Sequence, residues 1–227
     1  MQKLSLRLKT IFDLVPQNAK VCDIGCDHAF LSIELIKSGK AKSVIAADIN
    51  EKPLKKAEEN IKKSGVENIS LRLGDGLKAI KKGEADTVIV AGIGGEVIWG
   101  IISRGMEITA NKDMTLILQP TTSPEFLRKN LYENGFEILS EAPVEENGKL
   151  YSVMRCVYSG EKAKREEYFY FSGLVDPQNP VGKKYIEKQR DRAYKCMTAL
   201  EKIENKTEEL AFYKEIYENL WRLTADS

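Results

Sequence analysis

The sequence predicts an α/β fold, in which a doubly wound, mostly parallel sheet is followed by a smaller helical segment. Three observations predict it. Short β-prone runs alternate with segments of helical period between residues 20 and 134. Glycine or aspartate directly follows each of the first four β-prone runs. From residue 159 the composition shifts to a charged connection and two long helical runs. Ligands of such sheets lie across the carboxyl ends of the strands, so a site is expected there.

The first elements follow from the spacing of apolar residues. Apolar side chains recur at steps of three and four over residues 3–15, which predicts a helix that covers the front of the sheet. The next expected elements are a strand at 20–24, a helix at 29–37, a strand at 43–47, a helix at 52–63 and a strand at 69–73. Gly39 and Gly65 suit the C-terminal ends of these two helices.

The second half of the sheet is predicted in the same way. Strands are expected at 86–91 and 114–118, with a helix around 97–102 between them and another ending near Asn134. Thr122 or Ser123 is expected to cap this last helix through its side chain.

The pattern changes after Gly135. Two β-prone runs, 136–145 and 149–158, are joined by Glu146-Asn147-Gly148, and Asn-Gly between strands is a strong hairpin signal. Parallel strands closed by an antiparallel hairpin match the Rossmann-like class I methyltransferase sheet better than the dehydrogenase sheet.

Two helical runs, 183–204 and 208–223, complete the chain and predict an antiparallel helical hairpin with coiled-coil-like packing. We therefore expect a cofactor-binding domain at 1–159 and a helical domain at 160–227.

Composition narrows the class of protein. The 227 residues are 42% apolar and carry a formal net charge of +1, so no bulk electrostatic signal of a nucleic-acid binder is present. We expect no signal peptide and no membrane span. Four cysteines without a paired framework indicate reduced thiols and a cytoplasmic location. With a single histidine, no metal site is expected.

The stretch 21–30 forms the first strand, a polar turn and the start of a helix. A pyrophosphate cofactor requires several glycines in such a turn, but only Gly25 is present, and Asp27 would repel phosphate. The frame of a nucleotide site is therefore present without its phosphate chemistry.

Three aspartates at successive strand ends favour a different ligand. S-adenosylmethionine has no phosphate, but it has two cationic centres, a ribose diol and an adenine amine. Asp48 is expected to bind the ribose hydroxyls, Asp75 to face the adenine amine between Gly74 and Gly76, and Asp23 to lie beneath the methionine part. A lone aspartate here is more often a helix cap or a solvated turn residue. Three in register favour the cofactor.

Several stretches at the start of the chain and at the strand ends stand out: Leu4-Ser5-Leu6-Arg7-Leu8, Asp23-Ile24-Gly25-Cys26-Asp27-His28-Ala29, Ala47-Asp48-Ile49-Asn50, Gly74-Asp75-Gly76-Leu77, Ala91-Gly92-Ile93-Gly94-Gly95 and Gln119-Pro120. In order and spacing they closely resemble the bacterial TrmK family, as does the helical hairpin. Members of that family are S-adenosylmethionine-dependent methyltransferases that act on N1 of the adenine at position 22 of tRNA. Cys26 departs from the family pattern, where Ser or another small residue is expected.

The resemblance implies roles for individual residues. The cofactor would be lined by Asp23, Gly25, Cys26, Asp27, His28, Asp48, Ile49, Asn50, Gly74, Asp75, Gly76, Gly92, Ile93 and Gly94. The glycines after the fourth strand would let a base approach the methyl group. From the chemistry of the reaction we expect three catalytic residues: Asp27 to stabilise developing positive charge, Gln119 to read the adenine edge, and Arg7 to meet a phosphate or the cofactor carboxylate.

The tRNA substrate requires cationic contacts, although the hairpin segment carries as many acids as bases. The candidates are Lys3, Arg7, Lys184, Lys188 and Arg192. No obligate protein partner is evident. Two alternatives stay open: a methyltransferase of another RNA, a protein or a small molecule, and a non-catalytic adaptor that binds partners through its helical hairpin.

Overall fold

The computed structural model describes residues 4–203 and 205–225. Within them a sheet of seven strands runs in the order β3-β2-β1-β4-β5-β7-β6. The strands are β1 (Ala19–Ile24), β2 (Ala41–Asp48), β3 (Ile69–Leu73), β4 (Thr87–Ile93), β5 (Thr115–Pro120), β6 (Phe136–Glu146) and β7 (Lys149–Tyr158). β1 to β5 are parallel, and β7 inserts antiparallel between β5 and β6. The predicted sheet with its closing hairpin is confirmed.

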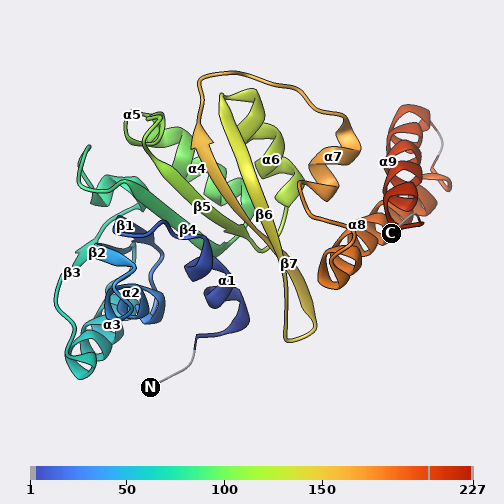
Figure 1. The fold of residues 1–227 in the computed structure, drawn as a ribbon. Coiled ribbons are helices and arrows are strands. Elements are labelled where there is room, and N and C mark those ends of the chain that lie inside the picture. The colour runs from blue at the N-terminus through green and yellow to red at the C-terminus, as the bar shows by residue number, and fades with distance from the viewer. Residues whose placement is uncertain (1–3, 204, 226–227) are drawn as a thin grey trace.

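Helices cover both faces of the sheet (Figure 1). The helices of the described residues are α1 (Leu6–Leu14), α2 (Phe30–Lys37), α3 (Glu51–Ser64), the 3-10 helix η1 (Gly76–Ala79), α4 (Gly95–Arg104), α5 (Met106–Thr109), α6 (Pro124–Glu133), α7 (Glu167–Ser172), α8 (Pro180–Leu200) and α9 (Thr207–Ala225), of which α8 and α9 lie beside the sheet. η1, α5 and α7 are short elements that apolar periodicity did not predict, because four to six residues are too few to show a period.

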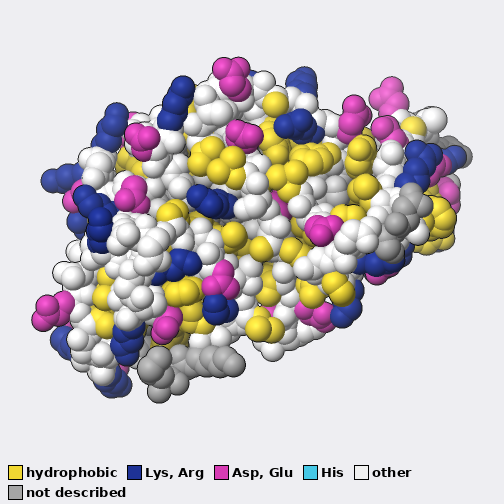
Figure 2. All heavy atoms as spheres, in the orientation of Figure 1, with side chains coloured by type: hydrophobic (Ala, Val, Ile, Leu, Met, Phe, Trp, Pro, Cys, Tyr) yellow, Lys and Arg dark blue, Asp and Glu magenta, His cyan; other side chains and the backbone are white. Residues whose placement is uncertain are grey.

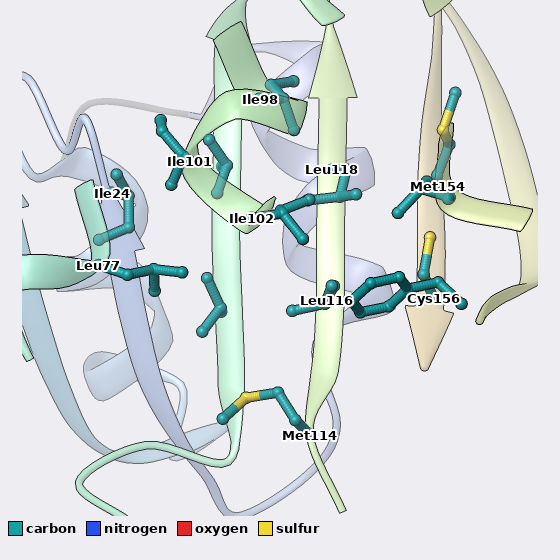
Figure 3. Close-up of a cluster of buried hydrophobic side chains, with 14 of the residues drawn as sticks. Ile24, Leu77, Ile98, Ile101, Ile102, Met114, Leu116, Leu118, Met154 and Cys156 are labelled. Carbon is teal, nitrogen blue, oxygen red and sulfur yellow. The ribbon is translucent and has the colours of Figure 1, made fainter. Parts of the chain in front are cut away.

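The two sheet faces build two separate cores because successive strand residues point to opposite faces. Leu116 and Leu118 of β5 pack with α4 in one cluster, together with Met154 and Cys156 of β7 (Figure 3). Ile117 lies in the other cluster, with α1 and α2. The helix predicted at 3–15 therefore covers the sheet as expected.

The hairpin between β6 and β7 confirms the Asn-Gly signal. Asn147 and Gly148 have φ angles of +50° and +71°, and Glu146 pairs with Lys149. Left-handed backbone at both central residues matches the right-handed twist of the two strands.

The start of α6 differs from the prediction. Ser123 holds the cap position in left-handed backbone, with φ +49°, and across the described residues its side chain makes no capping hydrogen bond. Its hydroxyl donates instead to Glu96 Oε1 at 3.4 Å. The predicted side-chain cap is wrong because the preceding loop is tied to its neighbours through its backbone: Thr121 N donates to Ile93 O at the end of β4, and Gly95 N at the start of α4 donates to Thr122 O.

A buried ion pair joins the sheet to the C-terminal helices. Arg128 of α6 is fully buried and donates to both carboxylate oxygens of Glu141 on β6. It also donates to Tyr170 O at 2.7 Å and to the Tyr185 hydroxyl at 3.0 Å. Gly173 is required beside this pair, because a Cβ there would overlap both side chains. Burial by itself lowers the pKa of Arg128, but the charge and the hydrogen bonds of Glu141 raise it above its ordinary value, so Arg128 stays protonated.

The C-terminal helices α8 and α9 pack against each other around a third cluster that includes Ile186, Ala193, Ile216 and Leu220. The domain border at residue 160 stays a prediction, since Tyr170 packs in the core of the sheet. Within residues 4–203 and 205–225, no helix is long and apolar enough to cross a membrane.

Candidate active site

A cavity of about 580 Å³ opens at the carboxyl ends of the parallel strands, within the size range of small-molecule sites. It is lined by the turn after β1, the ends of β2, β3 and β4, one side of α4, and Arg7. The structure brings together thirteen of the fourteen predicted cofactor residues: Asp23, Gly25, Cys26, Asp27, His28, Asp48, Ile49, Asn50, Gly74, Asp75, Gly76, Gly92 and Ile93.

Gly94 is the exception among the residues described around this cavity. A Cβ at Gly94 would lie 2.9 Å from Thr122 Oγ1. Close packing of the β4 and β5 ends therefore explains this glycine without a ligand. By contrast, Gly92 has φ +82° and lies beside Arg7, at the cavity wall.

The turn after β1 is held by its backbone. Gly25 and Cys26 both donate their N–H groups to Ala47 O, at 2.8 and 3.1 Å. Asp27 and Ala29 adopt positive φ angles of +46° and +57°, which is uncommon and costly for residues other than glycine. The turn thus displays the carboxylate of Asp27, whose side chain is 72% exposed, at the mouth of the cavity.

His28 has a defined environment in this turn. Its ring stacks on Phe30 with centroids 5.4 Å apart, and its Nε2 lies 3.7 Å from Asp27 Oδ1. Its backbone carbonyl accepts a hydrogen bond from Asn60 of α3. These contacts hold His28 in place at the wall of the cavity.

Asp23 is the buried acid of the site. It accepts a hydrogen bond from the Ser32 hydroxyl at 2.7 Å. Burial raises its pKa to about 6, and the nearby charge of Asp48 acts in the same direction. At neutral pH the carboxylate is ionised at a cost that a cationic ligand would offset.

Asp48 and Asp75 differ in burial and in their contacts within the protein. Asp48 is buried at the end of β2, and its Oδ1 accepts the N–H of Asn50 at 2.9 Å. Asp75 is half-exposed and lies 3.4 Å from Lys78 Nζ and 3.9 Å from an Arg104 nitrogen. Gly76 beside it has φ +58°, and a Cβ added at this position would lie only 3.1 Å from Ile101.

Arg7 and Gln119, both predicted to be catalytic, form one unit. Arg7 donates to Gln119 Oε1 at 2.7 Å, and the same oxygen accepts the N–H of Gly92 at 3.1 Å. Gln119 is fully buried and donates its amide to Pro120 O. Glu146 accepts the backbone N–H of Arg7 at 2.9 Å. This environment favours a role for Gln119 in holding Arg7 at the cavity wall rather than in contacting a base.

Among the predicted RNA-binding cations that the structure describes, Arg7 lines this cavity and the three on α8 do not. Lys184 bonds to Glu145 at 2.8 Å, Lys188 to Leu150 O at 2.9 Å and Arg192 to Glu125 at 2.5 Å. All three tie α8 to the first 159 residues. Lys3 lies outside the described residues. On the face drawn in Figure 2, basic and acidic side chains are interspersed rather than separated.

Burial disfavours the reactive thiolate form of the cysteines near the site. Cys22 and Cys26 are buried, and burial raises the pKa of both thiols. All four cysteines of the chain are free. Among the described residues, no group of three or more His, Cys, Asp or Glu is arranged to hold a metal ion.

Some lining residues were missed by the sequence reasoning. Val97 and Ile101 stand one turn apart on α4 and line the cavity, although the sequence pattern placed them only in a helix. Val97 is 55% exposed, as is expected for an apolar wall that a flat ligand would cover. A second apolar stripe on α4, offset from Ile98 and Ile102, was the available signal.

Comparison with known proteins agrees with this geometry. Residues 4–154 match the family model of a methyltransferase domain. The chain is 33% identical over 219 residues to the tRNA (adenine(22)-N(1))-methyltransferase of Bacillus subtilis, covering 96% of this chain and 86% of that protein. The crystal structure of the B. subtilis M1A22 tRNA methyltransferase TrmK superposes with a TM-score of 0.87, at 30% identity, over 99% of this chain and all of that one. The chain belongs to the TrmK family.

Another similar structure holds a ligand. The structure of Streptococcus pneumoniae Sp1610 in complex with S-adenosyl-L-methionine superposes on the present chain with a TM-score of 0.81 at 31% identity, over 95% of this chain and 100% of Sp1610. Because the similarity extends through α8 and α9, the helical hairpin is part of the shared TrmK architecture.

Proposed function

We propose that this TrmK-family protein transfers a methyl group from S-adenosyl-L-methionine to N1 of the adenine at position 22 of tRNA. The observation that carries the proposal is the set of three carboxylates, Asp23, Asp48 and Asp75, around one cavity in a chain that spans nearly all of the B. subtilis enzyme.

The residues present fit this cofactor. The buried carboxylate of Asp48 suits the ribose diol, and half-exposed Asp75 suits the adenine amine. Asp23, ionised at neutral pH, suits the ammonium group of the methionine part. Ile49 and Val97, both largely exposed, supply apolar surface for the adenine ring. When bound, the cofactor supplies an electrophilic methyl group.

The chemistry required of the protein is modest. N1 of neutral adenine has a lone pair in the ring plane and needs no prior deprotonation. The product ring is cationic, so the protein must position the base, exclude water and stabilise positive charge. Asp27, exposed at the cavity mouth, is the acid we assign to this stabilisation. We assign Arg7 to a phosphate or to the carboxylate of the cofactor.

The substrate must be opened before it can react, because N1 lies on the pairing edge of adenine. Phosphate contacts then set the register of the RNA, and Lys184, Lys188 and Arg192 stay our candidates for them. We expect the protein to act in the cytoplasm, where tRNA is found.

A methyl-transfer assay tests the function. With labelled cofactor and unmodified tRNA transcripts, wild type should label tRNA, and nuclease digestion should yield 1-methyladenosine. Replacing adenine 22 by guanine should remove the product, and Asp27→Ala should slow transfer by roughly ten- to a hundredfold. Labelling that persists without adenine 22 would point to another RNA site. Labelling of protein alone would favour a protein methyltransferase. Absence of cofactor binding would favour a non-catalytic adaptor.

The raised pKa of Asp23 predicts a pH-dependent affinity. Below its pKa of about 6 the carboxyl group is mostly protonated, and binding an ammonium group then requires loss of that proton. Affinity for S-adenosylmethionine should therefore rise with pH, by about tenfold between pH 5 and pH 7. Calorimetry across this range measures it. Asp23→Asn, which keeps an acceptor for Ser32, should bind S-adenosylmethionine more weakly, with an affinity that does not change with pH. An equal pH dependence in both proteins would contradict the assignment of Asp23 to the ammonium group.

A further inference from the structure

A second cavity, of about 370 Å³, lies where the helical hairpin meets the sheet. Its walls are the segment from the end of β5 to the start of α6 (120–125), the start of β7 (150–152), and four α8 side chains, Tyr185, Lys188, Gln189 and Arg192. We call it the α8 pocket. Its size is in the range of small-ligand sites.

The α8 pocket contains polar atoms that the fold leaves unpaired. Gln189 is only 3% exposed, and its Oε1 has no hydrogen-bond partner within the described part of the chain. The same holds there for Glu125 Oε2, while Glu125 Oε1 is paired with Arg192. Buried polar groups are nearly always hydrogen-bonded, so two such atoms around one cavity indicate a polar ligand.

Cations and an aromatic ring complete the lining. Lys188 Nζ lies 6.0 Å from the centre of the Tyr151 ring and donates to Leu150 O. Burial lowers the pKa of Lys188, and the neighbouring positive charges of Arg192 and Lys149 add to this effect. An anion at this point would reduce the repulsion between the positive charges of Lys188 and Arg192. Of these two, Arg192 already pairs with Glu125.

The α8 pocket adjoins the cofactor cavity. Arg7, which lines the cofactor cavity, places its guanidinium 5.9 Å from the same Tyr151 ring. Thr121 N donates to Ile93 O, and Gly95 N donates to Thr122 O, each at 2.8 Å. The loops after β4 and β5 thus form neighbouring walls of the two cavities, with Tyr151 between Arg7 and Lys188.

We propose that the α8 pocket binds an unstacked adenine nucleotide of the tRNA substrate, with its base against Tyr151 and the amide of Gln189, and its phosphate near Lys188 and Arg192. This inference rests on the proposed function. A glutamine amide matches the N6 and N7 edge of adenine with two hydrogen bonds, and this pairing leaves N1 free. Aromatic rings are the usual platforms for unstacked bases.

Replacing Gln189 tests the pocket. Gln189→Leu is similar in size and removes the amide, so it should lower kcat/KM for tRNA by roughly ten- to a hundredfold. Its melting temperature and its affinity for S-adenosylmethionine should match wild type. Gln178→Leu, at an exposed position before α8, is the matched control and should leave all three quantities unchanged. Equal activity of Gln189→Leu and wild type would overturn the proposal.

Modified substrates identify the nucleotide. 7-Deazaadenine lacks the N7 acceptor, so at the bound position it should slow wild type by roughly tenfold and have little further effect on Gln189→Leu. Such non-additivity at position 22 identifies the methylated adenine as the occupant, and at an adjacent adenine it identifies a neighbour. Both support the pocket. Additive losses at every position tested would contradict it.

A binding experiment separates this inference from the proposed function. Adenosine 5′-monophosphate at millimolar concentration should shift the NMR signals of the Gln189 side-chain amide, without any methyl transfer, and Lys188→Ala should weaken this binding several-fold. If wild type fails to methylate tRNA while the shift is observed, the proposed function fails and the pocket stands. If transfer occurs but the Gln189 signals do not move, the pocket is wrong.

Discussion

Replacing Asp48 by alanine should weaken S-adenosylmethionine binding by roughly a hundred- to ten-thousandfold. The buried carboxylate uses Oδ1 to accept the N–H of Asn50, at the end of β2 and on the wall of the cofactor cavity. Two hydrogen bonds from a ribose diol to this charged group are worth about 1.5–3 kcal/mol each. Calorimetry with the purified variant measures the loss.

Three comparisons make this test specific. Asp48→Asn keeps an acceptor for Asn50 but loses the charge, so its affinity should be intermediate. Asp113→Ala, at an exposed position just before β5, should bind the cofactor like wild type. S-adenosylhomocysteine has the same ribose without the sulfonium charge, so its affinity for Asp48→Ala should fall as much as that of the cofactor. A loss confined to the cofactor would show that Asp48 acts on the sulfonium instead.

Replacing Arg128 by methionine should lower the free energy of unfolding by about 3–5 kcal/mol. The side chain is fully buried, and its removal leaves the carboxylate of Glu141 buried without its partner. It also leaves Tyr170 O and the Tyr185 hydroxyl without their donor, so the attachment of α7 and α8 to the sheet should suffer most. Urea unfolding and hydrogen exchange of α8 measure the two effects.

The control for this prediction lies next to it in the sequence. Lys129 on the same helix forms a partly exposed ion pair with Glu167, so Lys129→Met should cost less than about 1 kcal/mol. Adding Glu141→Leu to Arg128→Met should restore much of the lost stability, because the unpaired charge is removed. Equal losses for Arg128→Met and Lys129→Met would show that the buried network contributes little.

The local sequence pattern was sufficient to predict most of the strands of the sheet. Periodicity located the strands within a few residues, and Asn147-Gly148 located the hairpin, because these signals arise from the backbone and from burial on one face. The acids after the strands also predicted the cofactor cavity, since the carboxyl ends of parallel strands meet at one edge of the sheet.

Roles that depend on a distant partner could not be read in the same way. Gln119 was expected just after a strand and in contact with the adenine; it lies within β5, fully buried, and bonds to Arg7, 112 positions away in the chain. Ser123 looked like a helix cap, yet its loop is bound to the end of β4. Lys184, Lys188 and Arg192 of α8 were expected to contact RNA, and each of the three also bonds to the rest of the molecule.

The sequence by itself determined the α/β sheet, its closing hairpin, the helical pair and the acidic turns that define the family. Each of these depends on neighbours within about one element of the chain, so the pattern contains the information. Only the tertiary structure decided that Arg128 joins α6, β6, α7 and α8, and that Tyr151 lies between Arg7 and Lys188. Those contacts join segments far apart in the sequence, and burial of charged and polar groups, rather than any local preference, selects them.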